Sequence, residues 1–144
     1  MKKVLLCIMA FAILSCSSDD ENTSVIEEHG IRFNLNGTDY FLTDYSAEID
    51  PTNSLYRRVE ASFDNDTKKI VFFVEVEETN QIGQFLFQVD DVNWLSDGVL
   101  GGPRETSITM HTDTKMEGTF KITLVDTWYV PVHSFVNGVI NIQY

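Results

Sequence analysis

The chain is poor in cysteine, proline and basic residues. Its 144 residues include two cysteines and three prolines, and 22 acidic residues outnumber ten lysines and arginines, which gives a formal net charge of −12. Nucleic acids and anionic head groups are bound by basic surface, so this charge argues against both as partners. Cys7 and Cys16 lie near the start of the chain, which leaves the remainder without a thiol for a disulfide, a metal site or covalent catalysis.

Motifs that carry catalytic chemistry are also lacking. The sequence contains no G-x-S-x-G elbow, no H-E-x-x-H pair and no glycine-rich phosphate loop. His29, His111 and His133 are far apart and do not have metal-ligand spacing. A carboxylate pair of the glycosidase type stays an alternative, although abundant acidic residues do not single out one pair. We therefore expect a domain that is not an enzyme.

The first residues form a leader. Lys2 and Lys3 precede an apolar run over residues 4–14, which is shorter than the about 20 residues of a membrane-spanning helix. The run ends in Ile13-Leu14-Ser15-Cys16, which resembles a bacterial lipobox, in which the cysteine sulfur receives a diacylglycerol. We predict a signal peptide over residues 1–15 and a mature protein that is held on a membrane by acyl chains on Cys16.

An acidic segment follows the predicted lipidation site. Residues 17–21, Ser-Ser-Asp-Asp-Glu, resemble the signal that directs lipoproteins of Bacteroidota to the outer face of the outer membrane, although a solvated linker would have the same composition. Residues 16–29 have too few apolar side chains to fold and are predicted to be a flexible tether. We expect a lipid-anchored outer-membrane protein exposed at the cell surface, with the periplasmic face of that membrane as the alternative.

Residues 30–144 alternate between apolar and polar residues with a period of two. Ile31, Phe33 and Leu35 begin the pattern, and Asn36-Gly37 is typical of a primed hairpin turn. The same period recurs at residues 45–49, 59–63, 85–89, 108–110 and 116–124. Residues 70–74 are instead an apolar run with bulky side chains on both faces, which predicts a strand in the middle of the structure. The segments 128–135 and 139–144 are expected as two strands around Asn137-Gly138, and residues 90–105 as a long loop. The pattern predicts one all-β domain, an antiparallel β-sandwich or barrel-like structure of about eight to ten strands.

Three segments of this domain resemble a known group of proteins. They are Phe33-Asn34-Leu35-Asn36-Gly37, Glu117-Gly118-Thr119-Phe120-Lys121-Ile122-Thr123 and Val136-Asn137-Gly138-Val139-Ile140-Asn141-Ile142-Gln143-Tyr144. Together they resemble a family of small Bacteroidota lipoproteins of unknown function, whose members pair an opening Asn-Gly hairpin with a G-T-F strand and a final N-G strand ending in tyrosine. The resemblance implies an all-β fold and supplies no catalytic residues.

Two sets of residues are candidates for binding. Asp90, Asp91 and Asn93 offer hard oxygen ligands that would suit Ca²⁺, the one cofactor we consider, although their spacing does not follow the EF-hand pattern. Trp94, Trp128 and Tyr129 are large aromatics expected in irregular or edge positions, where they would stack on sugar rings or complete the core. We therefore expect a non-enzymatic domain that binds an envelope protein or has a structural role. The alternative is a carbohydrate-binding accessory lipoprotein that takes part in glycan capture.

Overall fold

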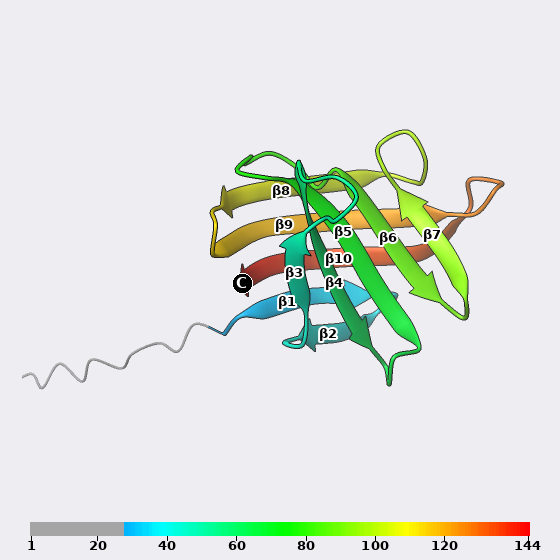
Figure 1. Cartoon of the computed structure of the whole chain (residues 1–144). Helices are drawn as coiled ribbons and strands as arrows, with labels where there is room; N and C mark the ends of the chain where they lie inside the picture. Colours follow the sequence, from blue (N-terminus) through cyan, green and yellow to red (C-terminus); the bar gives the residue numbers. More distant parts are fainter. Residues whose placement is uncertain (1–27) are drawn as a thin grey trace, which may run out of the picture.

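The structure, a computed structural model, describes residues 28–144 and shows two antiparallel five-stranded sheets packed face to face (Figure 1). The first sheet contains, in spatial order, β2 (Thr38–Leu42), β1 (Gly30–Leu35), β10 (Pro131–Gln143), β9 (Lys115–Val125) and β8 (Arg104–His111). The second contains β3 (Ser46–Ile49), β4 (Tyr56–Phe63), β5 (Lys68–Glu75), β6 (Gln84–Val89) and β7 (Val92–Ser96). The predicted all-β fold is confirmed as a β-sandwich. The predicted signal peptide, the predicted lipidation site Cys16 and nearly all of the predicted tether lie outside the described residues.

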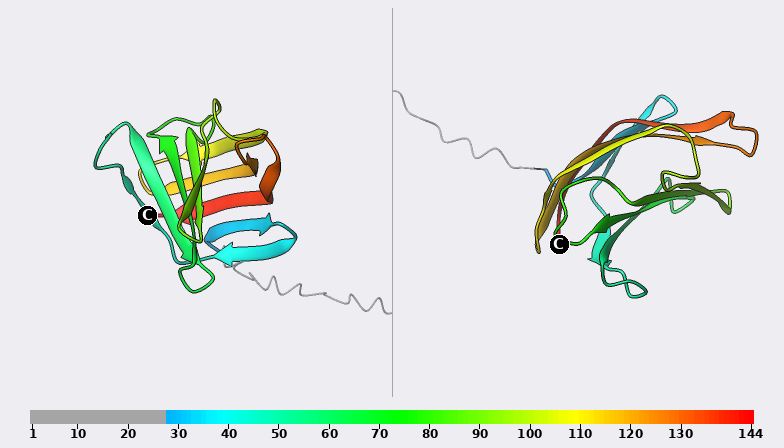
Figure 2. Two further views of the ribbon diagram at one scale, coloured as in Figure 1. Left: turned by 90° about the vertical axis from the view of Figure 1, so that its right-hand side faces the viewer. Right: turned by 90° about the horizontal axis from the view of Figure 1, so that it is seen from above.

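Consecutive strands lie in the same sheet except where the chain crosses between the two sheets. It makes β1 and β2, crosses to the second sheet for β3–β7, and returns to the first sheet for β8–β10, so that β10 pairs with β1. The second sheet is therefore a plain meander in which β5 is central, as its apolar run predicts. Figure 2 shows the two sheets as separate layers, with the loop between β3 and β4 standing out from the outer face of the second sheet.

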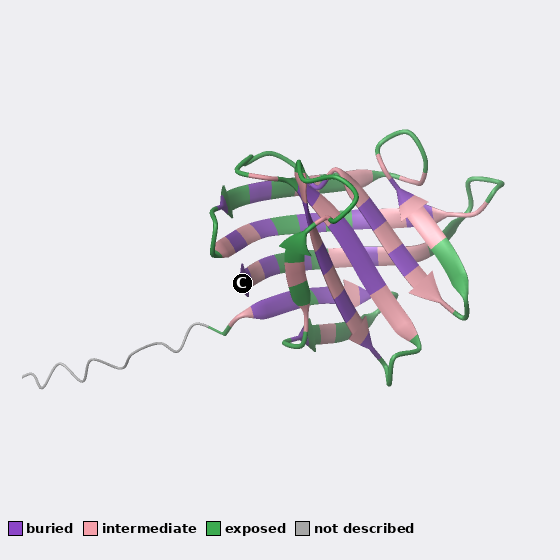
Figure 3. Cartoon of the chain, in the orientation of Figure 1, coloured by how far each residue is buried: buried purple, intermediate pink, exposed green. Residues whose placement is uncertain are grey.

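The core forms because both sheets turn their apolar alternation inward. Along β9 buried residues alternate with exposed or partly exposed ones, and β4 has the same pattern (Figure 3). The centre of the core is aromatic: Phe135 lies 5.1 Å from Phe85 and 5.2 Å from Phe87, measured between ring centroids. Edge-to-face packing of this kind is favoured by the charge distribution of the rings. Residues 28–144 thus supply both sheets and a complete hydrophobic core.

The structure differs from the alternation pattern in three places. Residues 92–96 form β7 inside the segment that was expected to be a long loop. A bulge between Ile108 and Met110 turns His111, and not Met110, into the core. Asn137-Gly138 is a bulge within β10 and not a hairpin turn, because the strand continues on both sides of the positive φ of Asn137.

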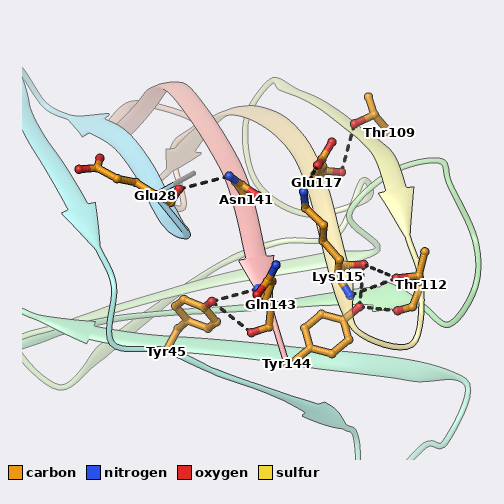
Figure 4. A network of polar contacts seen from close by, with 9 residues as sticks. All are labelled: Glu28, Tyr45, Thr109, Thr112, Lys115, Glu117, Asn141, Gln143 and Tyr144. Carbon is orange, nitrogen blue, oxygen red and sulfur yellow. Dashed lines mark hydrogen bonds and ion pairs between the residues drawn. The ribbon is translucent and has the colours of Figure 1, made fainter. Parts of the chain in front are cut away.

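The two ends of the domain are tied to neighbouring strands. Asn141 donates a hydrogen bond to the carbonyl oxygen of Glu28, 3.2 Å away, where the chain enters β1. The hydroxyl of Tyr144 donates to the carbonyl oxygen of Thr112 at 2.8 Å, and Tyr45 bonds the backbone of Gln143 (Figure 4). These contacts fix the final strand at the end of the sandwich where the domain begins.

Candidate functional site

The loop between β9 and β10 holds two large aromatic side chains in solvent. Trp128 is 83% exposed and Tyr129 is 82% exposed. The loop, residues 126–130, is called the aromatic loop below. Oδ1 of Asp126 accepts hydrogen bonds from the backbone nitrogens of Trp128 at 2.8 Å and Val130 at 2.9 Å. Asp126 also accepts a backbone hydrogen bond from Tyr129 and donates one to the carbonyl oxygen of Val130, each at 3.0 Å. Because these four bonds close the turn, the aromatic side chains project from a defined backbone.

The aromatic loop lies at the end of the sandwich opposite the point where the chain enters the domain. In Figure 1 β1 begins on the left, whereas this loop lies at the far right, and the view from above in Figure 2 agrees. The loop between β7 and β8 leaves the same end, since Gly102 donates a backbone hydrogen bond to Thr123 of β9 at 3.0 Å. A tether before β1 would therefore hold this end away from its anchor.

The second loop adds aliphatic side chains to this end. Val99 is 90% exposed and Leu100 is 58% exposed, and Val130 of the aromatic loop is also exposed. Asp97 shapes the turn by accepting hydrogen bonds from the backbone nitrogens of Val99 and Leu100 through Oδ1. These two hydrogen bonds lower the pKa of Asp97, and the bond from Leu100 has the larger effect. The carboxylate therefore stays ionised and keeps the turn closed at neutral pH.

Trp94 does not share this exposed position. It lies on β7, and its ring packs edge to face on His133, with 5.2 Å between the ring centroids. His133 also packs on Phe87 of the core at 4.9 Å. Burial lowers the pKa of His133, with Lys68 as the second cause, so the imidazole is neutral at pH 7. Trp94 therefore closes the core beneath the aromatic loop and does not form one platform with Trp128.

Asp90, Asp91 and Asn93, the candidate calcium ligands, lie in and beside a tight hairpin turn. Asp90 and Asp91 are the two central residues of the hairpin turn between β6 and β7, with φ of 50° and 60°, and Asn93 lies on the adjoining strand. Asp66 shares a hollow of about 260 Å³ with both aspartates, but two lysines also line it. Within residues 28–144 no three His, Cys, Asp or Glu side chains are grouped to hold a metal ion. Calcium binding here stays a prediction.

Sequence reasoning located the exposed aromatics but missed Val99 and Leu100. The signal was an apolar pair enclosed by Gly98 and by Gly101-Gly102, since glycines on both sides of two apolar residues indicate a loop and not a strand. Gly98 and Gly101 do have positive φ in the structure, which confirms their part in the turn.

Comparison with known proteins does not supply a function. The chain matches no protein-family model, no curated protein and no solved structure. In the described part of the chain, no helix is long and apolar enough to cross a membrane.

Proposed function

We propose that the protein is a lipoprotein anchored through Cys16 in the outer membrane, and that its β-domain binds a partner protein at the cell surface without catalysing a reaction. The binding role is supported by one observation, the exposure of Trp128 and Tyr129 on a loop held closed by Asp126. Large exposed apolar side chains that gather at one end of a domain are typical of interaction sites. The anchor is supported by the leader and by the lipobox-like sequence before Cys16.

An envelope protein with an apolar groove suits this end better than a glycan does. The other large exposed side chains at this end are aliphatic: Val130 and Val132 follow the aromatic pair in the chain, and Leu100 lies on the second loop. Aliphatic side chains exclude water from a protein interface, whereas a sugar needs hydrogen-bonding groups around the stacking ring. Tryptophan and tyrosine are also the residues that contribute most binding energy in protein interfaces.

Site-specific crosslinking on intact cells tests the proposed interface. A photo-reactive amino acid in place of Tyr129 should give an adduct of one defined mass, and Trp128→Ser in the same chain should reduce the yield. Thr119, exposed on the outer face of β9, is the matched position for the control probe. Equal adducts from positions 129 and 119, or none from position 129, would show that the aromatic loop is not the interface.

The anchor has its own test. Cys16→Ser should abolish incorporation of labelled palmitate and release the protein from the membrane fraction, because the proposed attachment is through acyl chains alone. External protease on intact cells should remove the wild-type domain if it faces outward. Full protection of the domain in cells whose outer membrane is intact would place it on the periplasmic face instead.

A further inference from the structure

A second concave site lies on the outer face of the second sheet, away from the aromatic loop. The loop between β3 and β4 stands out from this face (Figure 2), and beneath it is a hollow of about 460 Å³. We call it the outer hollow. Its lining consists of Asp50, Thr52, Asn53, Tyr56, Phe73, Gly83 and Gln84. Strand pairing explains the juxtaposition, because Arg58 pairs with Phe73, and Phe73 pairs with Gln84.

Two aromatic side chains and a glycine form the apolar part of the outer hollow. Tyr56 and Phe73 belong to neighbouring strands and point to the same outer face of the sheet. A Cβ placed on Gly83 would lie 3.5 Å from Cε1 of the Tyr56 ring. Because glycine has no side chain, the space beside that ring stays open.

Hydrogen-bonding groups without a protein partner surround these rings. Among residues 28–144, the Tyr56 hydroxyl, the Gln84 amide and the Asn53 side-chain nitrogen have no hydrogen-bond partner. Oδ1 of Asp50 accepts hydrogen bonds from the backbone nitrogen of Thr52 at 2.9 Å and from the hydroxyl of Thr52 at 2.8 Å. Within residues 28–144, Oδ2 of Asp50 accepts no side-chain hydrogen bond. The hollow thus offers donors and acceptors for several hydroxyl groups.

The lining excludes other ligand classes. It contains no lysine, arginine or histidine. The nearest cation is Arg58, whose charge helps to lower the pKa of Asp50, but its guanidinium is already paired with Glu60. A phosphate or carboxylate would therefore meet the ionised Asp50 without an unpaired positive charge in the lining. The thioether and long aliphatic side chains that bind acyl groups are also missing from it. Aromatic rings beside amide, hydroxyl and carboxylate groups match a pyranose, which has an apolar C–H face and a rim of hydroxyls.

We propose that the outer hollow is a saccharide-binding site, which takes the ring of an uncharged sugar against Tyr56 and Phe73 and bonds its hydroxyls through Asp50, Asn53 and Gln84. This site is separate from the aromatic loop, so the saccharide proposal can be tested independently of the proposed protein interface. The hollow is open to solvent, so it should bind the end of a single saccharide chain weakly, with a Kd of about 1 mM.

Amide NMR titration of the chain from Ser17, which retains both sheets and the whole core, tests the proposal. The probes are neutral oligosaccharides of glucose, mannose, xylose and N-acetylglucosamine, with oligogalacturonate as the charged comparison. At least one neutral probe should shift the Gly83 and Gln84 amides saturably, whereas oligogalacturonate should not. The proposal is overturned if no neutral probe shifts them at concentrations up to about 10 mM, or if oligogalacturonate binds equally well.

Filling the hollow gives the decisive variant. Gly83→Leu should weaken binding at least about tenfold, which corresponds to about 1.4 kcal/mol. Its backbone lies outside the left-handed region, and the nearest atoms to an added Cβ are at ordinary contact distances of 3.4 and 3.5 Å. Thr119→Leu, on the opposite sheet, is the matched addition of an exposed leucine. Gln84→Ala removes one polar contact without filling space and should also weaken binding. Undiminished binding by a folded Gly83→Leu protein would overturn the proposal.

Discussion

The guanidinium of Arg57 lies over the ring of Tyr144, the last residue of the chain, with 3.8 Å between Cζ and the ring centroid. Arg57 is only 9% exposed and points toward the core from the start of β4. Within residues 28–144 no carboxylate forms an ion pair with it, and it donates one hydrogen bond to the carbonyl oxygen of Ala47 at 3.2 Å. The tyrosine ring is therefore its main electrostatic partner in a site largely removed from water.

Truncating Tyr144 should destabilise the domain. Tyr144→Ala removes the ring beneath the buried charge and the hydroxyl bonds to the carbonyl oxygens of Thr112 and Lys115. We expect a loss of about 2–4 kcal/mol in the free energy of unfolding, measured by urea denaturation. Tyr144→Phe keeps the ring and should cost about 0.5–1.5 kcal/mol. Tyr129→Ala, which truncates an exposed tyrosine, is the control, and an equal effect of both alanine variants would refute this role.

The stability of the domain should fall at mildly acidic pH. Burial and the charge of Arg57 lower the pKa of His111, although carbonyl groups of Glu75 and Glu78 and the charge of Glu77 act in the opposite direction. The folded state then binds fewer protons than the unfolded state, so the free energy of unfolding decreases as the pH falls below the unfolded histidine pKa of about 6.5.

Urea midpoints between pH 7.5 and pH 5 measure this dependence. His111→Leu removes one titrating group and should flatten the curve, and His133→Leu should do so through the second histidine with a lowered pKa. His29 is partly exposed and comes directly before β1, so it belongs to neither sheet, and His29→Leu is the control. A slope that is unchanged in both core variants would mean that neither histidine causes the loss.

Most of the fold could be predicted because burial of one sheet face imposes a period of two. Ile31, Phe33 and Leu35 turn inward as their alternation indicates, and Asn36-Gly37 makes the expected turn with φ of 51° and 91°. The same dipeptide at Asn137-Gly138 makes a bulge, because both structures need a positive φ and only the pairing of β10 with β9 distinguishes them.

The candidate sites were predictable only in part. The sequence placed Trp94 in an expected loop and Trp128 at the start of an expected strand, but their exposure depends on which of them meets His133 of the core. The outer hollow was not predictable, since Tyr56, Phe73 and Gln84 come from three strands and meet only through sheet register. Local patterns report which face of a strand is buried, and not which outward side chains become neighbours.

The two tryptophans should differ in their accessibility to a fluorescence quencher. Trp128 is exposed on the aromatic loop, whereas Trp94 is half-buried and packs edge to face on His133. Acrylamide should therefore quench two populations in the wild-type protein, and Trp128→Phe should remove the accessible one. Trp94→Phe should leave the accessible population in place. Equal quenching of the two single-tryptophan proteins would contradict the described positions of the side chains.

Two glycines with different surroundings should respond differently to the same substitution. A Cβ on Gly138 would lie 2.5 Å from both the ring and the carbonyl oxygen of Phe120, so the core or the strand must shift to accept it. Gly138→Ala should therefore lower the free energy of unfolding by about 2–3 kcal/mol, as overpacking of a close-packed core does. Gly83→Ala meets neighbours only at ordinary contact distances and should change stability by less than about 0.5 kcal/mol. Urea denaturation of the pair measures the difference. If both variants were equally stable, the close approach of β10 to Phe120 would be wrong, and with it the bulge at Asn137 that brings the two strands together.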